Sequence, residues 1–122
     1  MLMPKARHKW TPEISQIEFT FSDRGAKGKA IWQKRDELLL KAGAKLTTEP
    51  QMNRNGTTNY SAKYAQVLRA DHAKQIANNI TKADIIFPSP NTLGIFLRYG
   101  GNNSWKNLID KDGKSLDDWS RA

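Results

Sequence analysis

The last third of the chain holds the pattern that most restricts its fold. Ala83–Phe87 predicts a short buried strand, with Ile85, Ile86 and Phe87 in succession. It leads into Ser89, which can cap a helix whose first position is Pro90, because proline has no N–H to lose there. Gly100 is a suitable end for that helix, and Trp105–Ile109 predicts a further strand. A strand, a short helix and a second strand in such close succession indicate a domain that mixes helix and sheet.

The first two thirds of the chain add a predicted hairpin and a longer helix. Ser15–Ser22 alternates apolar and polar residues, which is typical of a half-buried strand. Gly28–Lys34 and Glu37–Ala42 predict two more strands, and Ser61–Asn79 predicts one helix or two that meet within it. We therefore expect a single α+β domain over residues 15–122, with a small mixed or antiparallel sheet of about five strands and two or three helices. The order of the strands stays open.

Two segments are expected to lie outside this packed domain. Residues 1–14 are basic and contain little apolar surface, so we expect a flexible basic arm. The segment 47–61 is polar and long for a loop in so small a domain. Loops of this length are usually functional or mobile.

The charge of the chain suggests one class of ligand. Its 122 residues carry 20 Lys and Arg against 12 Asp and Glu, a net charge of +8. Such an excess favours binding to nucleic acid, because contacts to phosphates release condensed counterions; a basic domain without that role is the alternative. Because the chain has no cysteine, no apolar run behind the N-terminal charges and no span of about 18 apolar residues, we expect a cytoplasmic protein without membrane contact.

One candidate group of site residues lies on the predicted hairpin: Lys27, Lys29, Lys34 and Arg35. If the second strand alternates regularly, Lys27 and Lys29 share one face while Trp32 lies on the other. The lysines could then contact phosphates while the tryptophan fills the core.

A second candidate group gathers near the Asn-rich turn: Arg98, Asn103, Trp105 and Lys106. Asparagine can read adenine edges, and tryptophan can stack on an exposed base. The alternative is that Trp105 is a core residue and that the asparagines suit the turn geometry.

Catalytic and metal-binding patterns are not found. The chain has two histidines, His8 and His72, and neither has a cysteine or clustered carboxylates at metal-ligand spacing. The run that begins at Asp110 departs from a calcium loop, because its glycine comes fourth and its twelfth position is Arg121. We therefore expect a non-enzymatic protein with no cofactor and no metal.

Five short motifs resemble a small uncharacterised prokaryotic domain that often follows GIY-YIG endonuclease domains and occurs in proteins linked to restriction and modification. The motifs are Ala26–Gly28, Leu38–Gly43, Phe87–Asn91, Gly100–Trp105 and Asp112–Leu116. The chain is also similar to restriction-enzyme-associated "RAMA" modules, which share a Ser-Pro-Ser helix and an Asn-Gly-Trp turn. In this chain a serine replaces the glycine of that turn. The GIY-YIG signature itself does not occur.

The resemblance implies an accessory role, because the usual neighbours of this domain act on DNA and the domain itself has no agreed catalytic role. We therefore expect a non-enzymatic basic module that binds nucleic acid, DNA rather than RNA, or a DNA-processing complex. The alternative is a protein-interaction module or an inhibitor of a nuclease or host-defence protein. The patterns leave the oligomeric state open.

Overall fold

The structure, a computed structural model, describes residues 8–121. At its centre is a hairpin of two strands, β1 (Phe19–Asp23) and β2 (Ala26–Lys34), joined by Arg24 and Gly25. Both joining residues have positive φ, 51° and 84°. That backbone is typical of a type I′ hairpin turn, whose twist matches the twist of the flanking strands. The chain therefore reverses within two residues.

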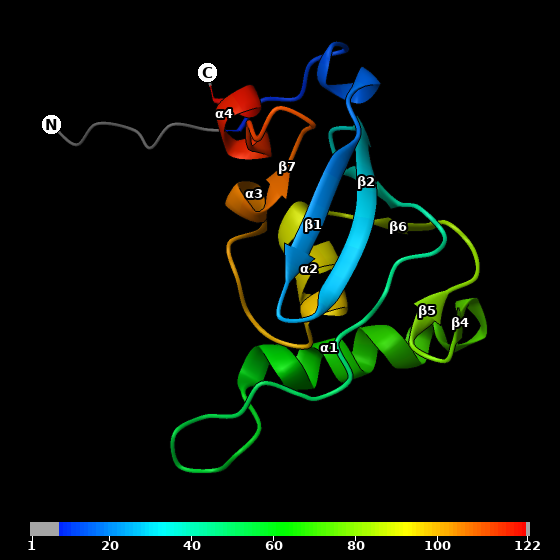
Figure 1. The fold of residues 1–122 in the computed structure, drawn as a ribbon, viewed down its shortest axis with the longest axis vertical. Coiled ribbons are helices and arrows are strands. Elements are labelled where there is room, and N and C mark those ends of the chain that lie inside the picture. The colour runs from blue at the N-terminus through cyan, green and yellow to red at the C-terminus, as the bar shows by residue number, and fades with distance from the viewer. Residues whose placement is uncertain (1–7, 122) are drawn as a thin grey trace, which may run out of the picture.

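Three further strands complete the main sheet (Figure 1). β3 (Glu37–Leu40) pairs with β2, β6 (Ile85–Phe87) pairs with β3, and β7 (Leu108–Ile109) pairs with β1. All pairs are antiparallel, and the strand order is β6-β3-β2-β1-β7. The predicted α+β class, with a sheet of about five strands, is confirmed.

A small second hairpin corrects the predicted long helix. The helix α1 (Tyr60–Asp71) ends well before Asn79, and β4 (Ile76–Ala77) then pairs with β5 (Ile80–Thr81). Asn78 and Asn79 form the turn between them with φ of 54° and 61°. Asparagine tolerates this left-handed backbone better than most residues, so two asparagines in succession favour a turn here over continued helix.

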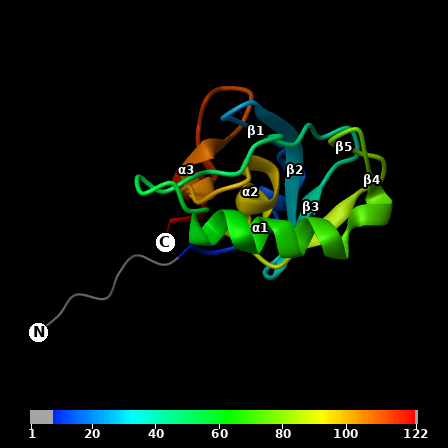
Figure 2. The ribbon, with the colours of Figure 1, turned by 90° about the horizontal axis from the view of Figure 1, so that it is seen from below.

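Helices cover one face and one end of the sheet. The helix α2 (Pro90–Arg98) packs behind β2, β3 and β6, while α1 packs against α2 across one end of the molecule (Figures 1 and 2). Two short helices, α3 (Ser104–Asn107) and α4 (Leu116–Ser120), follow it. The described residues thus contain four α-helices, against two or three predicted, and two 3-10 turns, η1 (Ile14–Gln16) and η2 (Ala73–Gln75).

The predicted start of α2 is confirmed, and its end differs by one residue. The hydroxyl of Ser89 accepts a hydrogen bond from the backbone N–H of Thr92 at 3.2 Å, and Pro90 occupies the first helical position. At the other end Tyr99, and not Gly100, takes the left-handed conformation, with φ of 60°.

The hydrophobic core lies between the sheet and α2. Alternate residues of the central strands point inward and are fully buried, including Phe19, Phe21, Ala30, Trp32, Leu38 and Leu40. They meet three buried residues of α2, Leu93, Phe96 and Leu97. No α-helix of residues 8–121 covers the opposite face of the hairpin, and β1 and β2 lie in front of α2 in Figure 1.

The predicted arm and the predicted strand at Trp105–Ile109 both need correction. Residues 1–7 of the arm lie outside the described residues, but residues 8–14 are packed on the domain. Ile14 is 1% exposed, and the indole N–H of Trp10 donates to the carbonyl of Trp32 at 2.8 Å. Of the predicted strand at Trp105–Ile109, only the last two residues form a strand, β7; residues 104–107 form the helix α3. Contacts with distant segments decide both cases.

Candidate nucleic-acid interface

The alternation of β2 places its lysines and its tryptophan on opposite faces. Lys27 and Lys29 are exposed on the uncovered face, whereas Ala30 and Trp32 are buried. The Lys29 side chain is 61% exposed. The sheet therefore presents these two lysines to solvent and uses the tryptophan to anchor the strand to the core.

Lys41 lies directly across the sheet from Lys29. The register that pairs Ala30 with Leu40 continues by one residue, and the Lys41 N–H donates to the Lys29 carbonyl at 2.9 Å. One carboxylate bridges the two ammonium groups: Glu18 lies 2.5 Å from the Lys41 nitrogen and 3.5 Å from that of Lys29. The hydrogen bond from Lys41 is the main cause that lowers the pKa of Glu18, with Lys29 adding to it. Glu18 therefore stays ionised and balances one of the two positive charges.

Lys45 lies in the same way across from Lys27. Each backbone N–H donates to the carbonyl of the other residue, at 3.0 and 2.7 Å. Both side chains are exposed, and neither forms an ion pair within residues 8–121. Like charges directly opposite each other destabilise a sheet. An anion bound between the two lysines would remove that repulsion.

Together these residues form a basic surface that we call the lysine face, defined by Lys27, Lys29, Lys41 and Lys45. A shallow hollow of about 500 Å³ opens on it, lined by the first three of these lysines, by Glu18 and Thr20, and by residues 28 and 42–44. Ammonium groups around an open hollow can attract phosphate or carboxylate. Among residues 8–121, no group of three or more His, Asp and Glu side chains is placed to hold a metal ion.

Arg98, a predicted site residue, is used inside the protein. Its guanidinium donates to the Asp23 carboxylate at 2.7 Å, to the Gln51 side chain at 2.9 Å and to the carbonyl of Gly101. These bonds tie the end of α2 to the β1–β2 turn and to the loop before α1. Because Nε and Nη1 are occupied in this way and the side chain is only 19% exposed, we remove Arg98 from the candidate interface.

Trp105 belongs to an aromatic cluster. The His8 ring stacks on it with a centroid separation of 3.6 Å and an interplanar angle of 6°, and Trp32 meets it edge-on at 5.3 Å. Trp105 therefore has two aromatic partners within the protein, one of them stacked flat on it, which argues against base stacking there. Asn103 and Lys106, next to it in the chain, are exposed.

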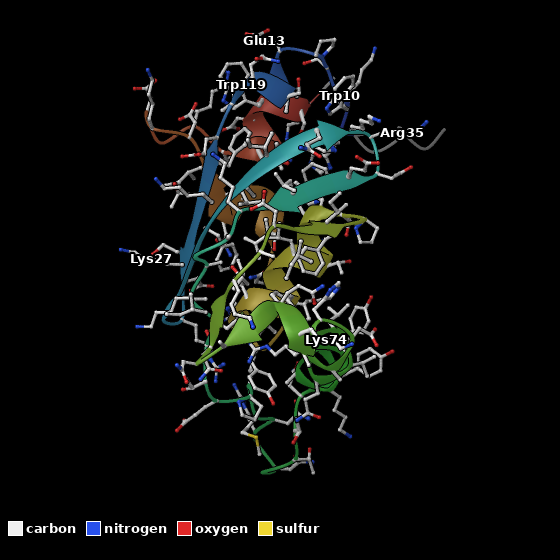
Figure 3. The ribbon with its side chains drawn as sticks, turned by 90° about the vertical axis from the view of Figure 1, so that its right-hand side faces the viewer. Trp10, Glu13, Lys27, Arg35, Lys74 and Trp119 are labelled. Carbon is white, nitrogen blue, oxygen red and sulfur yellow. The ribbon has the colours of Figure 1, made fainter. Side chains whose placement is uncertain are left out.

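The predicted residues thus separate into two places. Lys34 lies at the β2–β3 turn, paired across it with Glu37, and Arg35 shares a second hollow of about 410 Å³ with Trp105. Figure 3 shows Lys27 and Arg35 on opposite sides of the molecule. The structure brings Lys27 and Lys29 together with two lysines that sequence reasoning missed. Of these, Lys41 could have been found by extending the hairpin register, whereas Lys45 follows the turn at Gly43 and carried no local signal.

No helix within residues 8–121 has the length and apolar character needed to cross a membrane. A search of family models, curated proteins and solved structures finds no match to this chain. The resemblance to the domain that follows GIY-YIG endonucleases therefore stays a prediction.

Proposed function

We propose that this protein is a non-enzymatic module that binds DNA through its lysine face. One observation carries the proposal: four lysines occupy two neighbouring cross-strand pairs, and one carboxylate, that of Glu18, lies among them. The Lys27–Lys45 pair is unfavourable in the free protein, because like charges face each other there with no carboxylate of residues 8–121 bridging them. Phosphate groups would turn the same arrangement into a favourable one.

The spacing of the lysines suits a chain of anions better than one small anion. Lys27 and Lys29 are two residues apart on β2, about 6.6 Å along the strand, and each has a second lysine across the sheet. The chain as a whole carries a net charge of +8. This charge would draw a polyanion toward the protein from a distance, and the affinity would fall steeply with salt.

The test is fluorescence anisotropy of labelled DNA across a salt series, with the full chain and the double variant Lys27→Gln/Lys45→Gln. Each lost phosphate contact lowers the slope of log affinity against log salt by about 0.9 for duplex and about 0.7 for single strands, so the double variant should lose about 1.8 or 1.4. Lys74→Gln is the matched control, because Lys74 is exposed and lies away from Lys27 in Figure 3. No binding at low salt, or an unchanged slope in the double variant, would disprove the proposal.

A second candidate function is docking on a protein of a DNA-processing complex, or inhibition of one. It is favoured by a stripe on the outer side of α1, where Tyr60, Tyr64 and Val67 are 83%, 42% and 56% exposed. Aromatic side chains at helical spacing are common at protein interfaces. A pull-down with the full chain that recovers a partner, and loses it when both tyrosines are changed to serine, would support this role if DNA is not bound.

A further inference from the structure

We propose that the groove beside the lysine face accepts an unpaired nucleobase, so that the ligand is single-stranded nucleic acid. The inference rests on the proposed function and adds the class of ligand. The groove has a volume of about 630 Å³, within the usual range for small-molecule sites. It shares Glu18, Thr20 and Lys29 with the hollow of the lysine face. A strand whose phosphates lie on the lysines would therefore have a base within reach of the groove.

The walls of the groove come from three parts of the chain. One wall is η1 with the start of β1, where Ile17 is half-buried; the facing wall is the 110–112 turn with Trp119 of α4. Figure 3 shows Trp119 and Glu13 near each other at one end of the molecule. The groove thus lies where the first and last segments of the described chain meet beside β1.

Trp119 gives the groove an aromatic wall. Its indole N–H already donates to Asp110 at 2.8 Å. The Lys114 ammonium lies over the ring, 3.9 Å from its centroid, but Lys114 does not line the groove, whereas Trp119 does. The indole therefore has no free donor for a ligand, and what it offers is ring surface. Ring surface suits a base, because every base has a π-face, and stacking on aromatic residues is how sequence-tolerant single-strand binders hold bases.

The charge of the groove separates bases from phosphates. Four carboxylates and two lysines line it: Glu13, Glu18, Asp110, Asp112, Lys29 and Lys111. Within residues 8–121 the carboxylates of Glu13 and Asp112 accept no hydrogen bond, so these two are available to a ligand. Carboxylates repel phosphate but accept hydrogen bonds from exocyclic amino groups such as N4 of cytosine. The groove would then take an amino-bearing base while the phosphates stay on the lysine face. A base paired inside a duplex cannot enter it.

The experiment compares four labelled probes of equal length with the unmodified full chain: oligo-dC, oligo-dT, an abasic strand and a duplex. We expect oligo-dC to bind about tenfold tighter than the abasic strand, because stacking of one base in the groove should raise the affinity by a factor of about 5 to about 150. We also expect it to bind tighter than oligo-dT and the duplex. Equal affinity for oligo-dC and the abasic strand would overturn the inference while leaving phosphate binding intact. Failure of all four probes to bind at low salt would overturn the proposed function itself.

Three variants test the residues assigned to the groove, with Lys74→Gln as their control. Glu13→Gln/Asp112→Asn changes exposed carboxylates and should narrow the preference for oligo-dC over oligo-dT, whereas Lys74→Gln should leave the ratio unchanged. Trp119→Phe keeps an aromatic ring, so this variant should still bind oligo-dC more tightly than the abasic strand. Trp119→Leu has no ring, so it should bind the two strands equally. If Glu13→Gln/Asp112→Asn left the ratio of the oligo-dC and oligo-dT affinities unchanged, the assignment of these two carboxylates to the base would be wrong. The comparison of probes uses the unaltered protein, so it stays decisive even if Trp119→Leu fails to fold.

Discussion

Replacing Lys45 by glutamate should stabilise the protein while weakening its binding to DNA. Lys45 and Lys27 form a hydrogen-bonded antiparallel pair, which separates their Cα atoms by about 5.5 Å. With head groups ~6 Å apart, two unit charges in water repel by about 0.7 kcal/mol. A Debye length of about 10 Å at 0.1 M salt reduces this to about 0.4 kcal/mol. Glutamate converts the repulsion into an attraction of similar size, so the free energy of unfolding should rise by about 0.8 kcal/mol.

Urea denaturation measures this change. With a slope near 2 kcal/mol/M, the midpoint of Lys45→Glu should rise by about 0.4 M. In 1 M salt the Debye length is about 3 Å, and the gain should fall to about 0.2 kcal/mol. Lys74→Glu makes the same charge change away from the lysine face and serves as the control. A Lys45→Glu midpoint no higher than that of the control, or a gain that salt does not reduce, would refute the reasoning about opposed lysines.

Three other changes have expected outcomes that urea denaturation can check. Gly94→Ala should lower the free energy of unfolding by about 1–3 kcal/mol, because the new Cβ would lie 1.8 Å from the Ser104 hydroxyl. An unchanged urea midpoint would contradict this, since it would mean that α2 and α3 can move apart without cost. Arg69→Met should lower the free energy of unfolding by about 2–4 kcal/mol, because Arg69 donates hydrogen bonds to carbonyls at the end of α2 and in the loop before α1. Burial lowers the pKa of Arg69 only to about 10, so these are bonds from a charged group at neutral pH. A loss below about 1 kcal/mol would contradict this reasoning. The hydrogen bond from Trp119 lowers the pKa of Asp110 below 3.8. The ionised Asp110 therefore stabilises the fold above pH 3.8, and this stabilisation is lost as the pH falls through the lowered pKa. The Asp110→Asn variant should be less stable than the unaltered protein at neutral pH, and the difference in free energy of unfolding should shrink in acid.

Local sequence was sufficient wherever near neighbours in the chain decide the structure. Phe19 and Phe21 alternate with polar residues, and a regular strand must send both to one side, where both are buried. Ser89 and Pro90 start α2 because a cap and a first-turn proline act on the next few backbone groups. The same alternation predicted that Lys27 and Lys29 would share a face, opposite to Trp32, and the structure has them so.

Tertiary structure decided what depends on segments far apart in the chain. Trp105 has strand propensity, yet it lies in α3, where His8 stacks on it from the other end of the described chain. Arg98 is of a residue type that usually lies on the surface, but its guanidinium donates hydrogen bonds to the side chains of Asp23 and Gln51. Lys45 faces Lys27 because the chain crosses back beside β2 after β3 ends. The sequence by itself therefore determined the central strands, the start of α2 and the inward or outward direction of the side chains on those strands. The register between distant segments, which only the packed structure sets, decided which charges meet and which stay free to bind.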